Sequence, residues 1–271
     1  MPAMTDHEAN SLVKVIVASD SGSGKTGALA SLVDAGFNLR ILDFDNNLAV
    51  LRGYVKDKAK LANVHYVDQL QDQLKLVAGR VGVQKAPAFQ RAMDTLQEGG
   101  EKYWGAAIPP VVEWTPADVL VIDTLSMAGR ASLQMVMQLN GAGFKQPEIQ
   151  HYGTAMDNIE KWVQLLLSSV TPCHVIINTH ITGTEGDPRL YPSALGSKLP
   201  PNLGKYTGNL IGLRVVAGAR KFLFSKDGLL ALKTAVPMPE TIDIGNGWVE
   251  IFERLTGRKI NELLGAKPPS A

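Results

Sequence analysis

A glycine-rich octapeptide near the amino terminus constrains this chain more than any other feature. Residues 19–26 read Ser-Asp-Ser-Gly-Ser-Gly-Lys-Thr, after an apolar run that predicts a strand over 12–18 and before a helical pattern over 25–35. Small residues in such a turn let backbone N–H groups converge on phosphate oxygens, and the start of the helix adds partial positive charge. Strand, turn and helix in this order therefore predict a phosphate-binding loop.

The motif also assigns roles to its residues. We expect Lys25 to reach the β- and γ-phosphates of a nucleoside triphosphate and the Thr26 hydroxyl to ligate Mg²⁺, so ATP and Mg²⁺ are the predicted cofactors. Ser19 departs from the motif, which has glycine there, and a serine fits only if its φ is negative. The residues expected around the nucleotide are Ser21, Gly22, Ser23, Gly24, Lys25, Thr26 and Gly27.

An acidic pair follows the next apolar run, over residues 38–43. Asp43 ends that run and Asp45 lies two positions later, so the two carboxylates face the same way on an extended chain. Ligands in open parallel sheets bind at the carboxyl ends of strands, which favours a functional pair. A solvated turn at the strand end is the alternative, because Asp and Asn are common turn residues.

Two more apolar runs end in polar side chains. Residues 118–123 end at Asp123, which we expect to hold Mg²⁺ through water or through the hydroxyl of Thr26. The run over 174–180 ends in three polar residues, any of which could sense the γ-phosphate: Asn178, Thr179 and His180.

Composition excludes several classes of protein. The net charge of +1 provides no global basic field, so any nucleic-acid contact must be a local patch. The single cysteine, Cys173, excludes a disulfide framework and suits a reducing cytosol. No apolar run is long enough for a transmembrane helix, and the polar amino terminus is no signal peptide. We therefore expect a cytoplasmic protein with no membrane partner.

A basic segment stands out against this neutral background. Residues 181–209 are rich in Gly and Pro and predict a long loop, and residues 181–221 carry a net charge of +4. Basic side chains with interleaved aromatic residues suit single-stranded nucleic acid, whereas a lid with solvated lysines is the alternative. The candidate DNA-binding residues are Arg189, Lys198, Lys205 and Tyr206.

The remaining pattern predicts one domain over 12–264 with flexible tails at 1–11 and 265–271. Within it we expect a helix over 68–83 and an insertion over 86–117 that contains a short helix. Further expected elements are helices over 125–139, 148–170, 248–255 and 258–264, a strand over 210–216, and a β-hairpin whose arms are 221–225 and 229–235.

The order of these features resembles the RecA-like ATPase core over about residues 12–236. It is most similar to the compact phage-encoded RecA-like ATPases that assist single-strand annealing and recombination. The resemblance implies an α/β P-loop NTPase fold, with a mostly parallel sheet, helices on both faces and a C-terminal β-hairpin. It also implies binding of single-stranded DNA and assembly into a filament or ring. A single-strand-binding protein is a candidate for the partner that recruits it. Such a protein works in the host cytoplasm.

The same resemblance implies roles for individual residues. Asp45 takes the position of the carboxylate that activates the attacking water, where better-known members have Glu. The cluster at 178–180, with His180, couples the γ-phosphate to a DNA-binding loop at 181–209. A hairpin lysine reaches the ATP of a neighbouring subunit, with Lys233 the first candidate and Lys226 the second.

Two other functions remain open at this point. A small-molecule or nucleotide kinase would use the same loop with Arg189, Arg214 and Arg220 as a lid. A nucleotide-gated scaffold would bind ATP without turnover, because of the departures at Ser19 and Asp45. Regulatory GTPases and transporter-type ATPases are disfavoured, because the chain lacks Asn-Lys-x-Asp and Leu-Ser-Gly-Gly-Gln.

Overall fold

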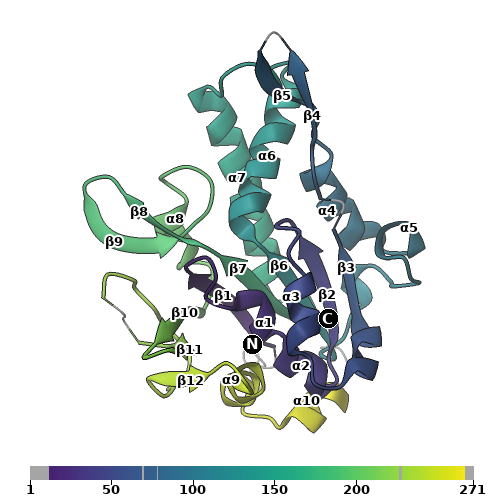
Figure 1. The fold of residues 1–271 in the computed structure, drawn as a ribbon, viewed down its shortest axis with the longest axis vertical. Helices are drawn as coiled ribbons and strands as arrows, with labels where there is room; N and C mark the ends of the chain where they lie inside the picture. The colour runs from purple at the N-terminus through teal and green to yellow at the C-terminus, as the bar shows by residue number, and fades with distance from the viewer. Residues whose placement is uncertain (1–11, 69, 78, 226–227, 266–271) are drawn as a thin grey trace, which may run out of the picture.

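The computed structural model describes residues 12–265 except 69, 78, 226 and 227. Its centre is an eight-stranded sheet in the order β12-β11-β10-β1-β7-β6-β2-β3 (Figure 1). The six strands from β10 to β3 run parallel, and β11 and β12 continue the sheet antiparallel. The bounds are β1 Lys14–Ser19, β2 Asn38–Asp43, β3 Val64–Val67, β6 Asp118–Asp123, β7 His174–Thr179, β10 Asn209–Val216, β11 Ala219–Leu223 and β12 Thr241–Asp243.

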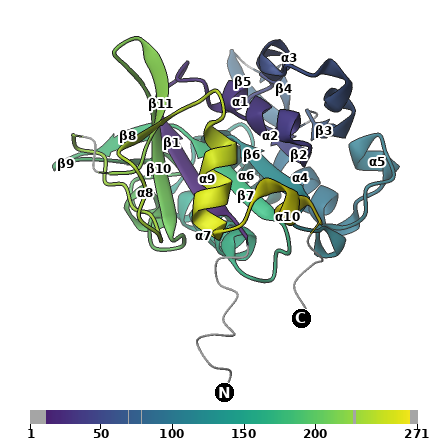
Figure 2. The same ribbon diagram turned by 90° about the horizontal axis from the view of Figure 1, so that it is seen from below.

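Helices cover both faces of this sheet, which confirms the expected fold class. One face carries α1 Lys25–Ala28, α2 Ala30–Ala35, α3 Ala49–Tyr54, α9 Gly247–Thr256 and α10 Ile260–Gly265. The other face carries α4 Ala88–Glu98, α5 Glu101–Trp104, α6 Leu125–Leu139, α7 Ile149–Leu167 and α8 Pro200–Leu203. Figure 2 shows α9 and α10, in yellow, next to each other. The described chain contains no helix long and apolar enough to cross a membrane.

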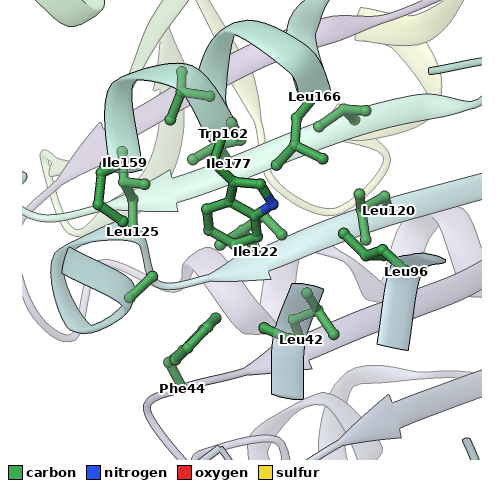
Figure 3. Packing of buried hydrophobic residues seen from close by; sticks show 14 of the residues in the cluster. Leu42, Phe44, Leu96, Leu120, Ile122, Leu125, Ile159, Trp162, Leu166 and Ile177 are labelled. Carbon is green, nitrogen blue, oxygen red and sulfur yellow. The ribbon is translucent and has the colours of Figure 1, made fainter. Parts of the chain in front are cut away.

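Strand periodicity explains the two cores. Successive side chains of a strand point to opposite faces, so Ile16 and Ala18 enter one core whereas Val15 and Val17 enter the other. Trp162 of α7 lies at the centre of the first core (Figure 3). Its ring makes edge contacts with two phenylalanine rings, at centroid distances of 6.4 Å for Phe44 and 5.4 Å for Phe89.

The expected helix over 68–83 is wrong. The structure has a hairpin there, formed by β4 Gln73–Val77 and β5 Arg80–Lys85. Leu74 and Leu76 alternate with polar residues, and Leu74 pairs across the hairpin with Val83. Gly79 has a φ of 76° in the connection, which glycine adopts without steric cost. The period-two pattern and the glycine outweigh the helical spacing of the same apolar residues.

The segment 181–209 has more structure than the expected loop. It contains a second hairpin, β8 Ile181–Thr184 with β9 Asp187–Pro192, followed by α8. The insertion at 86–117 does contain its expected helix, α4. Trp104 and Trp114 are buried in that insertion with ring centroids 5.9 Å apart, so they anchor it to the domain. Short 3₁₀ helices occur at Lys58–Asn63 and Val111–Glu113.

The C-terminal hairpin is present but pairs differently. β11 pairs with β10 through a turn at Ala217 and Gly218, both at positive φ, and not with residues 229–235. Its other edge pairs with β12. Residues 229–235 instead make single bridges, from Leu230 to Leu190 and from Lys233 to Leu210. Both arms are apolar, so the sequence pattern could not identify their partners. Lys226, the second candidate lysine, and both tails except Gly265 lie outside the described residues.

Candidate functional site

The phosphate loop has the conformation that its sequence requires. Gly22 and Gly24 have φ values of 75° and 104°, which L side chains rarely adopt. Ser19 ends β1 without a positive φ, since the non-glycine residues with positive φ in the described chain are Asn46 and Ala217. The condition on the serine is therefore met. The loop leaves β1 and turns directly into α1, which places its backbone N–H groups at the carboxyl end of the sheet.

Lys25 is held inside this loop by the residue that departs from the motif. Its Nζ donates to Ser19 Oγ at 2.7 Å and to the Asp20 carbonyl at 3.0 Å. The Ser23 hydroxyl donates to the same Ser19 Oγ at 2.7 Å. Burial lowers the pKa of Lys25, although the carboxylates of Asp123, Asp45 and Asp20 oppose that shift. Hydrogen bonds from within the loop therefore hold the Lys25 ammonium in place.

A hydroxyl and a carboxylate meet beside the loop. Thr26 Oγ1 donates to Asp123 Oδ2 at 2.8 Å, and Asn178 Nδ2 donates to Asp123 Oδ1 at 3.3 Å. Burial, followed by the charge of Asp45, raises the pKa of Asp123, whereas the bonds from Thr26 and Asn178 and the charge of Lys25 lower it. Hard oxygen ligands next to a phosphate site suit Mg²⁺. Thr26 and Asp123 therefore fit the ion that the motif implies.

Asp45 reaches the same place from the end of β2. Its Oδ1 accepts a hydrogen bond from Thr124 Oγ1 at 3.0 Å, and its Oδ2 lies 3.8 Å from His180 Nε2. The side chain is 24% exposed, so a carboxylate oxygen is accessible to water. Asp43 is only 2% exposed, and burial raises its pKa to about 6, with smaller effects from nearby backbone amides and from Asp123 and Asp45. Asp43 and Asp45 therefore lie in different environments.

The polar end of β7 connects this site to the segment that follows it. Asn178 contacts Asp123, and His180 approaches Asp45. Thr179 Oγ1 lies 3.1 Å from Ser126 Oγ and also donates to the Ser193 carbonyl, just after β9. The three residues thus divide their contacts between the carboxylates and the 181–209 segment.

The other predicted residues lie outside this cluster. Lys198 and Lys205 are exposed, and Arg189 is exposed but pairs with Asp187 at 2.7 Å. Tyr206 packs against the first core and its hydroxyl donates to Glu160. Lys233 exchanges backbone hydrogen bonds with Leu210 near the amino end of β10, away from its own phosphate loop.

Sequence reasoning missed three side chains that support the site. Thr124 bonds to Asp45, Ser126 bonds to Thr179, and the ring of Tyr54 on α3 lies against Gly27 of α1. The sequence could have indicated Thr124, because it directly follows the strand-end residue Asp123. No sequence signal indicated Ser126 and Tyr54, because helix packing alone brings them to the loop.

The fold and the site together define a class of protein. The phosphate loop follows β1, the Asp123 carboxylate ends β6, and β7 lies between these two parallel strands. This arrangement in a mostly parallel sheet with antiparallel C-terminal strands is that of a P-loop ATPase with a RecA-like core.

Comparisons with known proteins define the family. The profile of the AAA domain family matches residues 11–208, more than half of the chain, so this protein belongs to that family. A comparison with curated protein sequences finds no match. The solved structures that match include the crystal structure of the RadB recombinase, at 14% sequence identity and a TM-score of 0.40. The match covers 88% of this chain and 89% of that chain.

Proposed function

We propose that this protein hydrolyses ATP with Mg²⁺ and uses the reaction to control binding to single-stranded DNA. The convergence of Lys25, the Thr26–Asp123 pair and Asp45 at one end of the sheet supports this proposal most strongly. Phosphoryl transfer requires mainly positioning and charge neutralisation, and these four side chains provide both. We also infer that residues 12–264 form a single ATPase domain, because the two cores share one sheet.

Each residue then has one task. Lys25 leaves the Ser19 hydroxyl and neutralises the β- and γ-phosphates. Thr26 and Asp123 would hold Mg²⁺, and the ion would supply charge neutralisation at the phosphate oxygens. Asp45 orients the attacking water through Oδ2, which lies beside His180, while Thr124 holds Oδ1. Asp is one methylene shorter than Glu, so we expect slow turnover.

The 181–209 segment is the proposed DNA-binding surface. Lys198 and Lys205 present exposed charges there, and Arg189 becomes available when it leaves Asp187. His180 lies against Asp45, and its neighbour Thr179 bonds to Ser193 within the segment. A change at the γ-phosphate therefore has a short route to the DNA surface, through these two contacts and the peptide bond between Thr179 and His180.

Assembly completes the proposal. We propose a homo-oligomer, filament or ring, in which Lys233 reaches the ATP of a neighbouring subunit. Its position away from its own loop is consistent with a role in trans. The resemblance to phage-encoded recombination and annealing ATPases supports a role in recombination or strand annealing, with recruitment by a single-strand-binding protein.

The test is phosphate release from ATP, with and without single-stranded DNA, at two salt concentrations. We expect stimulation by DNA that weakens as salt rises, because phosphate contacts release counterions. Lys25→Ala should abolish nucleotide binding. Asp45→Asn should retain binding and lose turnover, whereas Asp157→Asn, at an exposed ion pair on α7, should change neither. Unchanged turnover in Asp45→Asn refutes the mechanism, and turnover that DNA never stimulates refutes the DNA coupling.

A second candidate function rests on a separate observation. A cavity of about 790 Å³ opens beside Asp43 and is lined by α3, β3 and the residues between them. A pocket of this size suits a small molecule, as an acceptor for phosphoryl transfer would require. ATP consumption that produces a phosphorylated acceptor, with no free phosphate, favours this kinase.

A further inference from the structure

Two side chains from distant parts of the chain meet above the phosphate loop. Arg220 lies on β11 and Tyr54 ends α3, 166 residues apart, and Arg220 Nη1 donates to the Tyr54 hydroxyl at 2.8 Å. Neither residue belongs to the cluster around Asp123 and Asp45. Both are exposed, Tyr54 to 44%, so their contact does not belong to a core.

The pair lies beside Gly24 of the loop and Gly27 of α1. A Cβ at Gly24 would lie 2.8 Å from Arg220 Cδ and 3.7 Å from Ile244 Cδ1, and a Cβ at Gly27 would lie 3.1 Å from the Tyr54 ring. Arg220 and Tyr54 therefore fill the space where side chains at Gly24 and Gly27 would lie. The Ile244 side chain adds apolar surface near the same glycine, Gly24.

The strand order indicates which part of a nucleotide would reach this pair. The ion-binding and water-orienting carboxylates follow β6 and β2, on one side of β1. The strand that carries Arg220, β11, lies on the other side of β1 (Figure 1). A triphosphate whose γ end points to Asp123 and Asp45 directs its nucleoside the opposite way. The nucleoside therefore leaves the loop near Arg220.

We propose that Arg220 and Tyr54 form the nucleoside subsite and hold a purine ring between a guanidinium and an aromatic face; this inference rests on the proposed nucleotide binding. Both groups stack on flat π surfaces, and a purine offers a larger surface than a pyrimidine. In the structure a hydrogen bond joins Arg220 to Tyr54 across the space that the base would occupy. The base enters when that bond opens, and the pair then closes on its two faces.

Inorganic tripolyphosphate separates this subsite from the phosphate loop, because it carries the three phosphates without a nucleoside. Titration calorimetry with Mg²⁺ would compare ATP and tripolyphosphate on wild type, Arg220→Ala, Tyr54→Leu and Tyr54→Phe. Arg220→Ala and Tyr54→Leu should each lower the affinity for ATP about tenfold, because each removes one stacking partner of the base. Neither should change the affinity for tripolyphosphate. Tyr54→Phe keeps the aromatic ring and should bind ATP with the affinity of wild type. Arg254→Ala, at an exposed ion pair on α9, is the matched control.

Nucleotide preference provides a second measurement. Wild type should bind ATP more tightly than CTP, and Tyr54→Leu should reduce that difference. Equal losses of ATP and tripolyphosphate in the truncations, or no loss of either, overturn the subsite. If wild type binds ATP no better than tripolyphosphate, the subsite is refuted while the phosphate loop stands. If wild type binds neither ligand, the proposed function itself fails.

Discussion

Replacing Asp43 with asparagine should stabilise this protein at neutral pH and not in mild acid. Asp43 is 2% exposed, and its pKa rises from 3.8 to about 6 because burial penalises the charged form. The backbone N–H of Asn47 donates to Asp43 Oδ1 at 3.4 Å, a bond that the oxygen of an asparagine can also accept. The substitution therefore removes a buried charge with little change of shape.

The magnitude follows from the pKa values of the folded and unfolded chains. Between pH 4 and pH 6 the native carboxyl holds a proton that the unfolded chain has lost, so the contribution of Asp43 to stability falls as pH rises through this window. A tenfold difference in proton affinity corresponds to about 1.4 kcal/mol, and a roughly hundredfold difference therefore sets an upper limit of about 3 kcal/mol above pH 6. Asp43→Asn should thus match wild type near pH 4 and exceed it by about 1–3 kcal/mol at pH 7.5.

Urea unfolding at pH 4.5 and 7.5 measures this difference directly. The buffer should contain a chelator and no nucleotide, because a bound cation nearby would offset the buried charge. Asp157→Asn, which removes an exposed carboxylate, should show no such pH dependence. A stability difference of the same size at both pH values, or a variant less stable than wild type at pH 7.5, refutes the reasoning.

Three further substitutions test the core and the loop. Trp162→Ala should cost about 3–5 kcal/mol in urea unfolding, because it empties the centre of the first core; a loss under about 1 kcal/mol contradicts that placement. Arg40→Met should lower the free energy of unfolding by about 3 kcal/mol, because it leaves the nearly buried carboxylate of Asp118 without the guanidinium that lies 3.3 Å away. The double variant Arg40→Met,Asp118→Asn should recover part of that stability; no recovery contradicts the pairing. Ser19→Gly should tighten ATP binding several-fold in calorimetry, because Lys25 no longer breaks a 2.7 Å bond; weaker binding shows instead that the serine helps to shape the loop.

Elements with strong local signals were predicted well. The helix over 125–139 has the bounds of α6, and the apolar runs ending at Asp43 and Asp123 are β2 and β6. Predictions failed where the same residues fit two kinds of secondary structure. The apolar residues of 68–83 fit helical and alternating patterns together, and only the pairing of β4 with β5 decides between them.

The site divides in the same way. The sequence determined the phosphate loop, its Lys25 and Thr26, and the acidic strand ends, because each depends on residues close together in the chain. The expected approach of Asp123 to the Thr26 hydroxyl is present as a hydrogen bond. Only the tertiary structure decided that Asp45 meets Thr124 and His180, and that Arg220 meets Tyr54. These contacts depend on the order of strands in the sheet, which brings together residues as many as 166 positions apart. Local pattern carries no information about that order, since each strand is apolar and could pair with any other.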